Sequence, residues 1–408
     1  MSSDELVVIT SFPEKGLVHG KAVVGIASYA KNTLLSLKSY KKNIKIFVLA
    51  EKLNGKEEYE DDNLEVKRVW KRNSFSIFPA LLKQILSLKS KNILVEFEIA
   101  MFGDLLFLIP LPLFLLLLAL TRKKITIVLH QVISDITELS GHINIKSRTK
   151  LLFLNLMIGI FYRTIISLSS KVIVFDEILK KKLEKLGKTD KIIVIEHGVE
   201  KFNVKITKDE AKRKLNLSKN EAVILYFGFL AWYKGTDFLV NNYRKNKGIK
   251  LIIAGGPNPN HINKAYYQSY VDKIQLDCLK KGILLTGFVQ EEDIPTYFSA
   301  CDAVILPYRT LMSASGPLSI AFSFAKPIFV SEKLSGIFET KDLSEALQKR
   351  NILKESLMFD SYADLEAKIE KLRDDKAFAQ ELREVSAEIA KKRDWNIIGK
   401  KYYEEIFN

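Results

Sequence analysis

Short apolar runs alternate with stretches whose apolar residues recur at helical spacing along most of the chain. In the first half, the pattern predicts buried strands at ELVVITSF, IKIFVLA, LEVKRVW, NILVEFE, ITIVLHQV, KVIVF and KIIVIEHG. The second half repeats the style with AVILYFG, IKLIIAGG, GILLTGF, AVILP and KPIFVS. Strands that alternate with helices form parallel sheets, so the two sets predict an α/β protein with two Rossmann-like domains.

A polar stretch without periodicity, at residues 197–211, marks the predicted join between the two sets. We expect a first domain at residues 1–199 and a second at 200–387, followed by a C-terminal amphipathic helix at 388–408. A chain of 408 residues is also too long for one ordinary core. Two parallel sheets that face each other bring loops and helix N-termini to a shared cleft, where ligands bind.

One strand-to-helix loop carries a Ser/Gly turn, at the start of SASGPLSIAFSFAKP. The first turn of a helix has unpaired N–H groups and the positive end of the helix dipole, and glycine lets a ligand approach the backbone. Ser313, Ser315 and Gly316 are therefore candidates for binding an anion such as a phosphate. The alternative is a helix cap without a ligand, and the turn by itself does not choose between the two.

Further segments follow one another in a characteristic order. GIASYAKNTLLSL, ITIVLHQV and KIIVIEHGVE precede YFGFLAWYKGTDFLV, which contains Gly228, Lys234 and Gly235. LIIAGGP, LLTGFVQEEDIPTYFSACDAVILP, GPLSIAFSFAKPIFVS and DWNIIGKKYYEEIF come next. In this order the segments resemble glycosyltransferase family 4, whose members have the GT-B fold, two Rossmann-like domains facing a central cleft. The last segment resembles the helix that crosses back to the first domain.

The resemblance implies transfer of a hexose from a UDP- or GDP-linked donor to a hydroxyl acceptor, with retention of anomeric configuration. It places the donor mainly on the second domain and requires neither metal nor other cofactor, because helix N-termini and basic side chains hold the leaving diphosphate. It gives His130 and Lys234 catalytic roles. The donor-binding residues that it implies are Gly25, Gly228, Lys234, Phe288, Val289, Ser313, Ser315, Gly316 and Glu339. Apart from the resemblance, Lys234 is an ordinary loop lysine and His130 a histidine at a sheet end.

Three positions depart from the family pattern. The Ser/Gly turn at residues 313–316 is called the phosphate turn below. The two glutamates that often flank it in the family are replaced by Met312 and Ile320, which cannot accept a hydrogen bond from a sugar hydroxyl. The arginine that often follows the first glycine of the loop is replaced by Phe229. Either the protein contacts its sugar and ribose through other residues, or it binds a sugar nucleotide without catalysing transfer. We expect activity, because Lys234, His130 and the phosphate turn remain.

The composition of the chain bears on its possible partners and on whether it has a metal site. The net charge of +15 suits nucleic acid, an anionic membrane or phosphorylated ligands. No nucleic-acid-reading motif is recognisable and the aromatic residues lie mainly in apolar runs, so nucleic acid is not expected as a partner. The two cysteines and five histidines are scattered along the chain without the spacing of metal ligands, so we expect no zinc site. A sugar phosphorylase or nucleotide-sugar epimerase with the same architecture remains an alternative.

The chain begins with MSSDELVVITSF, which is acidic and leads directly into a predicted strand. We therefore expect no signal peptide and a cytoplasmic location. Abundant Lys, Ile and Glu together with few Cys, Met and His are typical of thermophiles.

Two unusually apolar segments occur in the first domain. Leu105–Leu120 has no charged residue, but it is shorter than the ~20 residues of a membrane-spanning helix and contains Pro110 and Pro112. It is either a helix buried on the sheet or one inserted in the membrane interface, with Arg122, Lys123 and Lys124 near lipid phosphates. With the second segment, residues 151–171, it suits a glycan or lipid-linked acceptor and peripheral contact with the inner face of the membrane.

Overall fold

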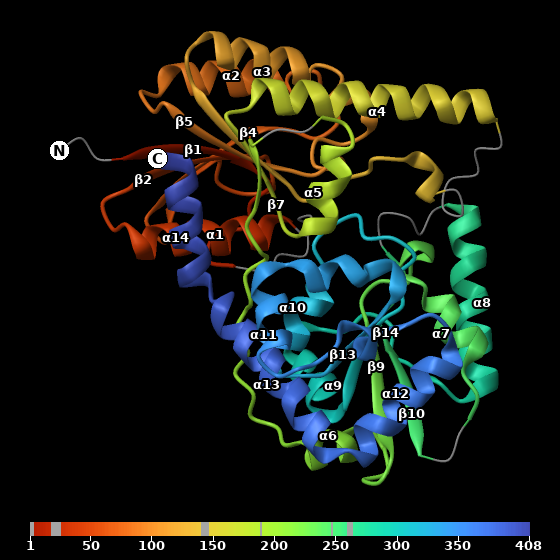
Figure 1. Ribbon diagram of the computed structural model, residues 1–408. Helices are drawn as coiled ribbons and strands as arrows, with labels where there is room; N and C mark the ends of the chain where they lie inside the picture. Colours follow the sequence, from red (N-terminus) through yellow and green to blue (C-terminus); the bar gives the residue numbers. More distant parts are fainter. Residues whose placement is uncertain (1–3, 18–25, 140–146, 188–189, 246–247, 259–263) are drawn as a thin grey trace.

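The computed structural model describes residues 4–17, 26–139, 147–187, 190–245, 248–258 and 264–408. Two domains are each built around one sheet, and the final helix lies against the first domain (Figure 1). The predicted α/β class with two mainly parallel sheets is confirmed.

The first domain contains an eight-stranded sheet in the order β3-β4-β2-β1-β5-β6-β7-β8. All neighbouring strands are parallel except β3 and β4, which form an antiparallel hairpin at the edge. The strands are β1 (Glu5–Thr10), β2 (Lys45–Glu51), β3 (Glu58–Asp61), β4 (Leu64–Trp70), β5 (Asn92–Phe97), β6 (Lys124–Leu129), β7 (Lys171–Val174) and β8 (Ile192–Val194). The central strands are buried on both faces, which explains their continuous apolar runs.

Helices cover both faces of this sheet (Figure 1). The helices and 3₁₀ turns are α1 (Ile26–Tyr40), α2 (Ile77–Ser87), η1 (Leu105–Leu108), α3 (Leu111–Leu120), η2 (Ile136–Leu139), α4 (Arg148–Leu168) and α5 (Glu177–Glu184). Helices α2, α3 and α4 form the layer farthest from the second domain, whereas α1 lies on the side that faces it.

The second domain contains a six-stranded parallel sheet in the order β11-β10-β9-β12-β13-β14. Its strands are β9 (Ala222–Phe227), β10 (Ile249–Ala254), β11 (Leu284–Leu285), β12 (Ala303–Leu306), β13 (Ile328–Ser331) and β14 (Met358–Phe359). Its helices are α6 (Lys208–Lys214), α7 (Thr236–Asn242), α8 (Ala265–Lys281), α9 (Ile294–Ala300), α10 (Gly316–Ser323), α11 (Lys341–Gln348), α12 (Tyr362–Asp374) and α13 (Lys376–Lys392). The 3₁₀ turns are η3 (Trp232–Lys234), η4 (Glu291–Asp293), η5 (Glu332–Glu339) and η6 (Lys354–Leu357).

The strand order reverses direction once in each sheet, between β1 and β5 and between β9 and β12. In open parallel sheets, ligands bind beyond the carboxyl ends of the strands at such a reversal, because the loops there diverge and leave a crevice. We therefore expect ligand-binding residues in the loops that follow β5, β9 and β12.

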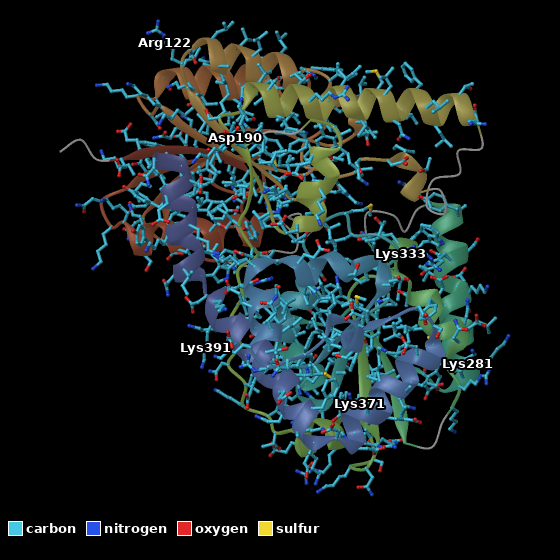
Figure 2. The ribbon with its side chains drawn as sticks, viewed as in Figure 1. Arg122, Asp190, Lys281, Lys333, Lys371 and Lys391 are labelled. Carbon is cyan, nitrogen blue, oxygen red and sulfur yellow. The ribbon has the colours of Figure 1, made fainter. Side chains whose placement is uncertain are left out.

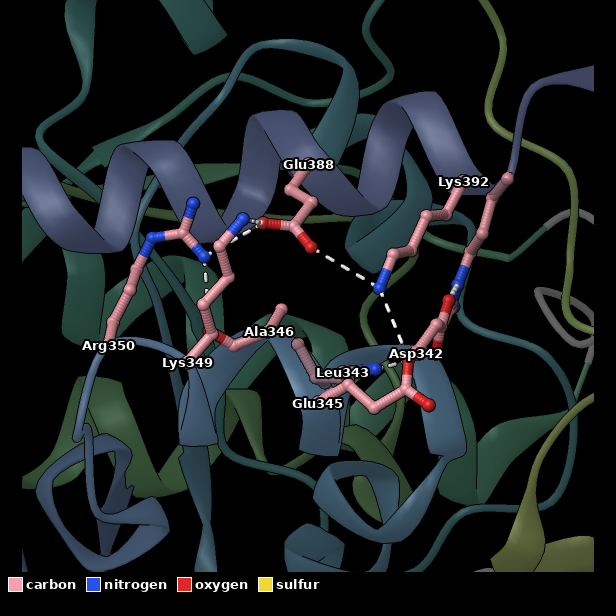
Figure 3. Close-up of polar contacts among 9 residues, drawn as sticks. Asp342, Leu343, Glu345, Ala346, Lys349, Arg350, Glu388 and Lys392 are labelled. Carbon is pink, nitrogen blue, oxygen red and sulfur yellow. Dashed lines mark hydrogen bonds and ion pairs between the residues drawn. The ribbon is translucent and has the colours of Figure 1, made fainter.

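A polar network fixes the point where the chain leaves the second domain. Figure 3 shows polar contacts around α13, where Glu388 binds Arg350, which lies just after α11, at 2.8 Å and Lys392 of the same helix at 3.2 Å. At the end of α13, the Arg393 guanidinium makes two hydrogen bonds to Asp342, at 2.7 and 3.0 Å. These contacts hold the last residues of the second domain before the crossing.

The last helix, α14 (Trp395–Phe407), packs against α1 of the first domain. Its Ile398, Tyr402 and Ile406 belong to the first core, and the Tyr402 hydroxyl is 2.8 Å from that of Tyr29. Gly399 permits the close approach, because a Cβ there would lie 2.5 Å from the carbonyl carbon of Ser36. The chain therefore ties its two domains together at its end.

Candidate functional site

The loop after β9 adopts a conformation that only glycine tolerates at two positions. Gly228 has a φ of 122°, and Gly235 has a φ of 70°. A Cβ on Gly235 would lie 1.9 Å from the carbonyl oxygen of Pro307, which follows β12. Glycine is therefore required for the loop to pack against the end of β12. This packing explains the Gly-x-x-x-x-x-Lys-Gly spacing in the sequence.

Lys234 directs its ammonium group back over the start of this loop. A Cβ placed on Gly228 would be 3.1 Å from Lys234 Nζ and 3.5 Å from Pro317 in the first turn of α10. The ammonium group and the start of α10 thus both border the open backbone of Gly228. Within the described residues no carboxylate lies within ion-pair distance of it, and burial lowers the pKa of Lys234 to about 8.

The start of α10 lies beside that ammonium group. Ser315 caps the helix, and its side-chain oxygen accepts a hydrogen bond from the N–H of Leu318 at 3.4 Å. Gly316 is the first helical residue, and a Cβ there would meet no atom within 4 Å. The first N–H groups of a helix have no partner within it and carry the positive end of the dipole. Helix end and ammonium group together can hold an anion such as a diphosphate.

Two residues absent from the sequence prediction brace the loop. The Arg309 guanidinium makes two hydrogen bonds to the Asp237 carboxylate, at 2.8 and 2.6 Å, and donates to the Trp232 carbonyl at 2.5 Å. The N–H of Arg309 also donates to the Tyr233 carbonyl at 2.7 Å. Such paired, charge-assisted bonds fix geometry well, so they position the Lys234 backbone. The pair is 72 positions apart along the chain, and neither residue alone signals its role.

The loops after β9 and β11 place two phenylalanine rings together. Phe229 and Phe288 are stacked, with centroids 6.3 Å apart and planes at 26°, and Phe288 is 64% exposed. The backbones approach closely here, since a Cβ on Gly256 would lie 2.8 Å from the nitrogen of Phe288. Val289 is half-buried and packs against the second core. An exposed apolar surface beside Gly228 suits a planar ring.

The two remaining donor-site predictions in the second domain fall where the domains meet. Ser313 forms an isolated β-bridge with Gln131 of the first domain. Next to it, the Met312 carbonyl accepts a 2.7 Å hydrogen bond from the N–H of Val132. Glu339 forms an ion pair with Lys181 of α5. Ser313 therefore adjoins the phosphate turn but also links the domains, and the Glu339 carboxylate is already paired.

The two apolar departures from the family pattern have packing roles. Met312 is 6% exposed, and Ile320 packs on α10 against the second core. Neither side chain offers a hydrogen-bonding group to a sugar hydroxyl.

On the first domain, His130 directly follows β6 and is buried. Its Nε2 lies 2.6 Å from Glu96 Oε2, and its ring packs edge-on against Tyr29 and Phe175, with centroids 4.8 and 5.0 Å away. Glu96 therefore fixes the orientation of the imidazole. The sequence prediction did not include Glu96, although a carboxylate within the apolar strand NILVEFE is costly to bury and signals a partner. Gly25, predicted near the donor phosphates, lies outside the described residues.

Among the described residues there is no group of three or more His, Cys, Asp or Glu side chains that could hold a metal ion. The Lys234 ammonium group and the start of α10 both offer positive charge to a phosphate. Their arrangement beside the stacked rings of Phe229 and Phe288 favours binding of a phosphorylated ligand.

The second domain is similar to a known protein family. The model of a family described as glycosyl transferases group 1 matches residues 207–393. An uncharacterized glycosyltransferase of Methanocaldococcus jannaschii is 25% identical over 183 residues, which cover 42% of this chain and 44% of that protein. A GDP-mannose:glycolipid 4-beta-D-mannosyltransferase of Xanthomonas campestris is 28% identical over 120 residues, covering 28% of this chain and 32% of that protein. The aligned segments thus span less than half of each relative.

Solved structures match over nearly the whole chain. Sucrose-phosphate synthase from Thermosynechococcus elongatus has a TM-score of 0.68 at 15% identity, with 98% of both chains covered. Anabaena Alr3699/HepE, determined with UDP, has a TM-score of 0.64 at 15% identity, again with 98% of both chains covered. At these identities the likeness concerns the fold, and the predicted GT-B fold is confirmed.

Proposed function

We propose that this protein is a retaining hexosyltransferase, because residues 207–393 match the model of the glycosyl transferases group 1 family. The donor is a UDP- or GDP-linked sugar, and the acceptor is a hydroxyl group of a glycan or a lipid-linked sugar. The observation that carries the proposal is the half-buried ammonium group of Lys234, which borders the open backbone of Gly228 together with the start of α10. A cation without an ion-pair partner in a cleft calls for an anionic ligand.

In the reaction, the bond between the anomeric carbon and the diphosphate oxygen breaks while the acceptor oxygen bonds to the same face of that carbon. The leaving oxygen becomes more negative as the bond lengthens and takes up the acceptor proton. Lys234 and the N–H groups at the start of α10 stabilise that developing charge, and such fixed charges contribute strongly to catalysis. His130, held by Glu96, orients the sugar from the facing domain.

The nucleotide is bound beside Phe229 and Phe288 in this proposal. The Xanthomonas relative uses GDP-mannose according to its description, and the Anabaena fold neighbour was determined with UDP. The assays proposed below therefore use both GDP-linked and UDP-linked sugars. Stacked phenylalanine rings offer a nucleobase an apolar face, whereas the arginine expected at position 229 would have offered a charge to the phosphates.

The assay for this proposal incubates the protein with GDP-mannose or UDP-glucose and a glycolipid in vesicles, and measures released GDP or UDP. We expect release that depends on the glycolipid, with proton NMR of the product showing the donor's anomeric configuration. If the protein binds the nucleotide but releases no GDP or UDP with any donor and acceptor, the alternative is favoured: a protein that binds sugar nucleotides without catalysing transfer. The apolar side chains at positions 312 and 320, which replace two glutamates of the family, are the reason for considering this alternative.

We further propose that the first domain lies on the cytoplasmic face of an anionic membrane. The outer surface of η1, α3 and α4 is apolar and exposed, at Leu105, Leu106, Ile109, Leu113, Leu116, Leu117, Leu120, Leu152, Phe153, Leu156, Met157 and Ile160. Helices α3 and α4 pack against each other in the layer farthest from the second domain (Figure 1). Monomeric proteins rarely expose so many neighbouring large apolar side chains, so this face calls for an apolar environment.

Charge complementarity favours a lipid surface as that environment. Arg122 projects outward at the end of α3 (Figure 2), and Lys124, Arg148 and Lys150 are exposed near the ends of α3 and α4. Lys123, also predicted to lie near lipid phosphates, donates to the carbonyls of Leu88 and Ser90 at 3.2 and 2.5 Å, so its ammonium group has partners within the domain.

Helix α4 has the length and composition of a membrane-spanning helix, with a mean hydropathy of 1.8. Its inner face nevertheless packs on the first core through Tyr162, Ile165 and Ile166. The Tyr162 hydroxyl also accepts a hydrogen bond from the N–H of Ile133 at 3.1 Å. Leaving the domain to span a bilayer would break these contacts, so we place α4 in the membrane interface, parallel to its plane.

Vesicle flotation tests the membrane proposal. We expect the protein to float with vesicles that contain phosphatidylglycerol, and the double variant Leu113→Glu/Leu120→Glu to remain in solution. Leu279→Glu is the matched control, because Leu279 is 79% exposed on α8 of the second domain. Absence of wild-type binding, or dimerisation of the wild type that the double variant abolishes, would contradict the proposal.

A further inference from the structure

The residues that lead into the phosphate turn, 310–312, are held by the first domain. The Lys182 ammonium group of α5 donates to the Thr310 hydroxyl at 3.0 Å and to the Leu311 carbonyl at 2.9 Å. Lys182 is 8% exposed, so little water competes for these hydrogen bonds. Loss of a buried donor is costly, because its acceptors are left unsatisfied. One side chain of the first domain therefore fixes two consecutive residues of the second.

The backbone that follows β6 holds the next two residues. The Met312 carbonyl accepts its hydrogen bond from the N–H of Val132 at 2.7 Å, and Ser313 forms its isolated bridge with Gln131. Gln131 and Val132 directly follow His130 in the chain. A backbone contact thus joins the histidine that orients the sugar in the proposed function to the turn that holds the diphosphate.

The phosphate turn is not tightly packed on the side of the first domain. A cavity of about 30 Å³ lies between the domains, and its lining includes Ala314, Ser315 and Leu318 of the second domain and Phe175 and Asp176 of the first. Space of this size can hold a water molecule. The turn therefore has room to shift, and its place depends on the contacts that hold residues 310–313.

We propose that Lys182 is a positioning residue, which sets the place of the phosphate turn in the donor site. The first N–H groups of α10 stabilise a phosphate only at hydrogen-bond distance from its oxygens, so a small shift of the turn weakens binding. Lys182 acts through Thr310 and Leu311, without contacting the donor. The donor site is therefore complete only when α5 of the first domain contacts the second domain. This inference rests on the proposed function and deepens it.

Calorimetric titration with nucleoside monophosphates and diphosphates separates a shifted turn from a loosened fold. Wild type and Lys182→Met are titrated with GMP and GDP, and with UMP and UDP. Methionine keeps the apolar stem of lysine but donates no hydrogen bond. In the series that the wild type binds, we expect Lys182→Met to lower the affinity for the diphosphate about tenfold. Affinity for the monophosphate, which depends more on the stacked rings of Phe229 and Phe288, changes little.

Two further variants complete the experiment. Lys180→Met is the matched control, because Lys180 lies two positions earlier on α5 and is only half-buried, and we expect it to bind both nucleotides as the wild type does. Thr310→Val removes the hydroxyl acceptor while Lys182 keeps its bond to the Leu311 carbonyl, so we expect a smaller loss of about threefold, again confined to the diphosphate. The double variant Lys182→Met/Thr310→Val should bind the diphosphate no more weakly than Lys182→Met alone, because both changes break the same contact.

Thermal melting shows whether each variant folds, and Thr310→Val carries the test if Lys182→Met does not. Unchanged diphosphate affinity in Lys182→Met and Thr310→Val would overturn the inference. Equal loss of monophosphate and diphosphate affinity, the same loss in Lys180→Met, or additive losses in the double variant would overturn it too. In each of these cases the wild type still binds nucleotide, so the proposed function stands. Wild type that binds neither nucleotide series would refute the proposed function itself, and the inference with it.

Discussion

Replacement of Lys234 by methionine is expected to stabilise the free protein while it removes ligand binding. Burial lowers the pKa of the Lys234 ammonium group from 10.5 to about 8. That difference corresponds to ~3 kcal/mol against the charged form in the folded state. Methionine keeps the unbranched stem without the charge, so Lys234→Met is expected to raise the free energy of unfolding at pH 7 by up to ~3 kcal/mol.

The stability gained by Lys234→Met depends on pH, and the pKa shift fixes the direction of that dependence. Below pH 8 the folded and unfolded chains both carry the charge, and the folded state bears the full desolvation cost. As pH rises from about 8 to 10.5, the folded protein loses its proton first and the cost disappears. The extra stability of Lys234→Met is therefore complete below pH 8, shrinks between pH 8 and 10.5, and is absent above that range.

Urea unfolding of both proteins at pH 7 and pH 10, with titration of GDP and UDP, measures the two effects together. We expect the variant to be more stable at pH 7 and to lose nucleotide affinity, and turnover to fall by roughly one to three orders of magnitude. A destabilised variant that keeps its nucleotide affinity would refute the reasoning, because Lys234 would then support the fold rather than a ligand.

Three further predictions concern the loop that holds Lys234. Gly235→Ala is expected to cost more than ~2 kcal/mol of stability, because it combines a φ of 70° with a contact of 1.9 Å; Gly16→Ala, with a φ of 79° and no atom within 4 Å, should cost only about 1 kcal/mol in the same melting experiment. Arg309→Lys keeps the charge but cannot bind Asp237 through two nitrogens, so nucleotide affinity should fall about tenfold with little change in melting temperature; equal affinity would show that the brace is dispensable. Nucleotide affinity of the wild type should also decline as pH rises through about 8, as Lys234 loses its proton; Lys234→Arg, which stays charged, should give a flat profile.

The sequence predicted the parts of the fold that repeat locally. Apolar runs marked the buried parallel strands, because a strand covered on both faces must be apolar throughout. The edge hairpin was not predicted, since β3 has the sequence EYED and is largely exposed, so it leaves no apolar signal. The run Leu105–Leu120 has no periodicity, and only the structure assigns Phe114 to the core and Leu113 to the surface.

The parts of the candidate site that consist of residues close together in the sequence could be predicted. The Gly228–Lys234–Gly235 spacing and the turn at Ser315 predicted two loops, and a Cβ on Gly228 would be close both to Lys234 Nζ and to Pro317 at the start of α10. The orientation of His130 was not predictable, because it depends on Glu96, which lies 34 positions away on another strand. Contacts of this kind depend on strand order, which no local pattern encodes.

Calorimetric titration of the wild-type protein with GDP and UDP tests the central claim most directly. We expect one of the two nucleotides to bind, and Lys234→Met to abolish that binding. The same nucleotide at a hundred times its dissociation constant should raise the unfolding free energy by about 2.7 kcal/mol. Binding of neither nucleotide to the wild type, or equal binding to wild type and variant, would contradict the claim that Lys234 and the start of α10 hold the diphosphate of a nucleotide sugar.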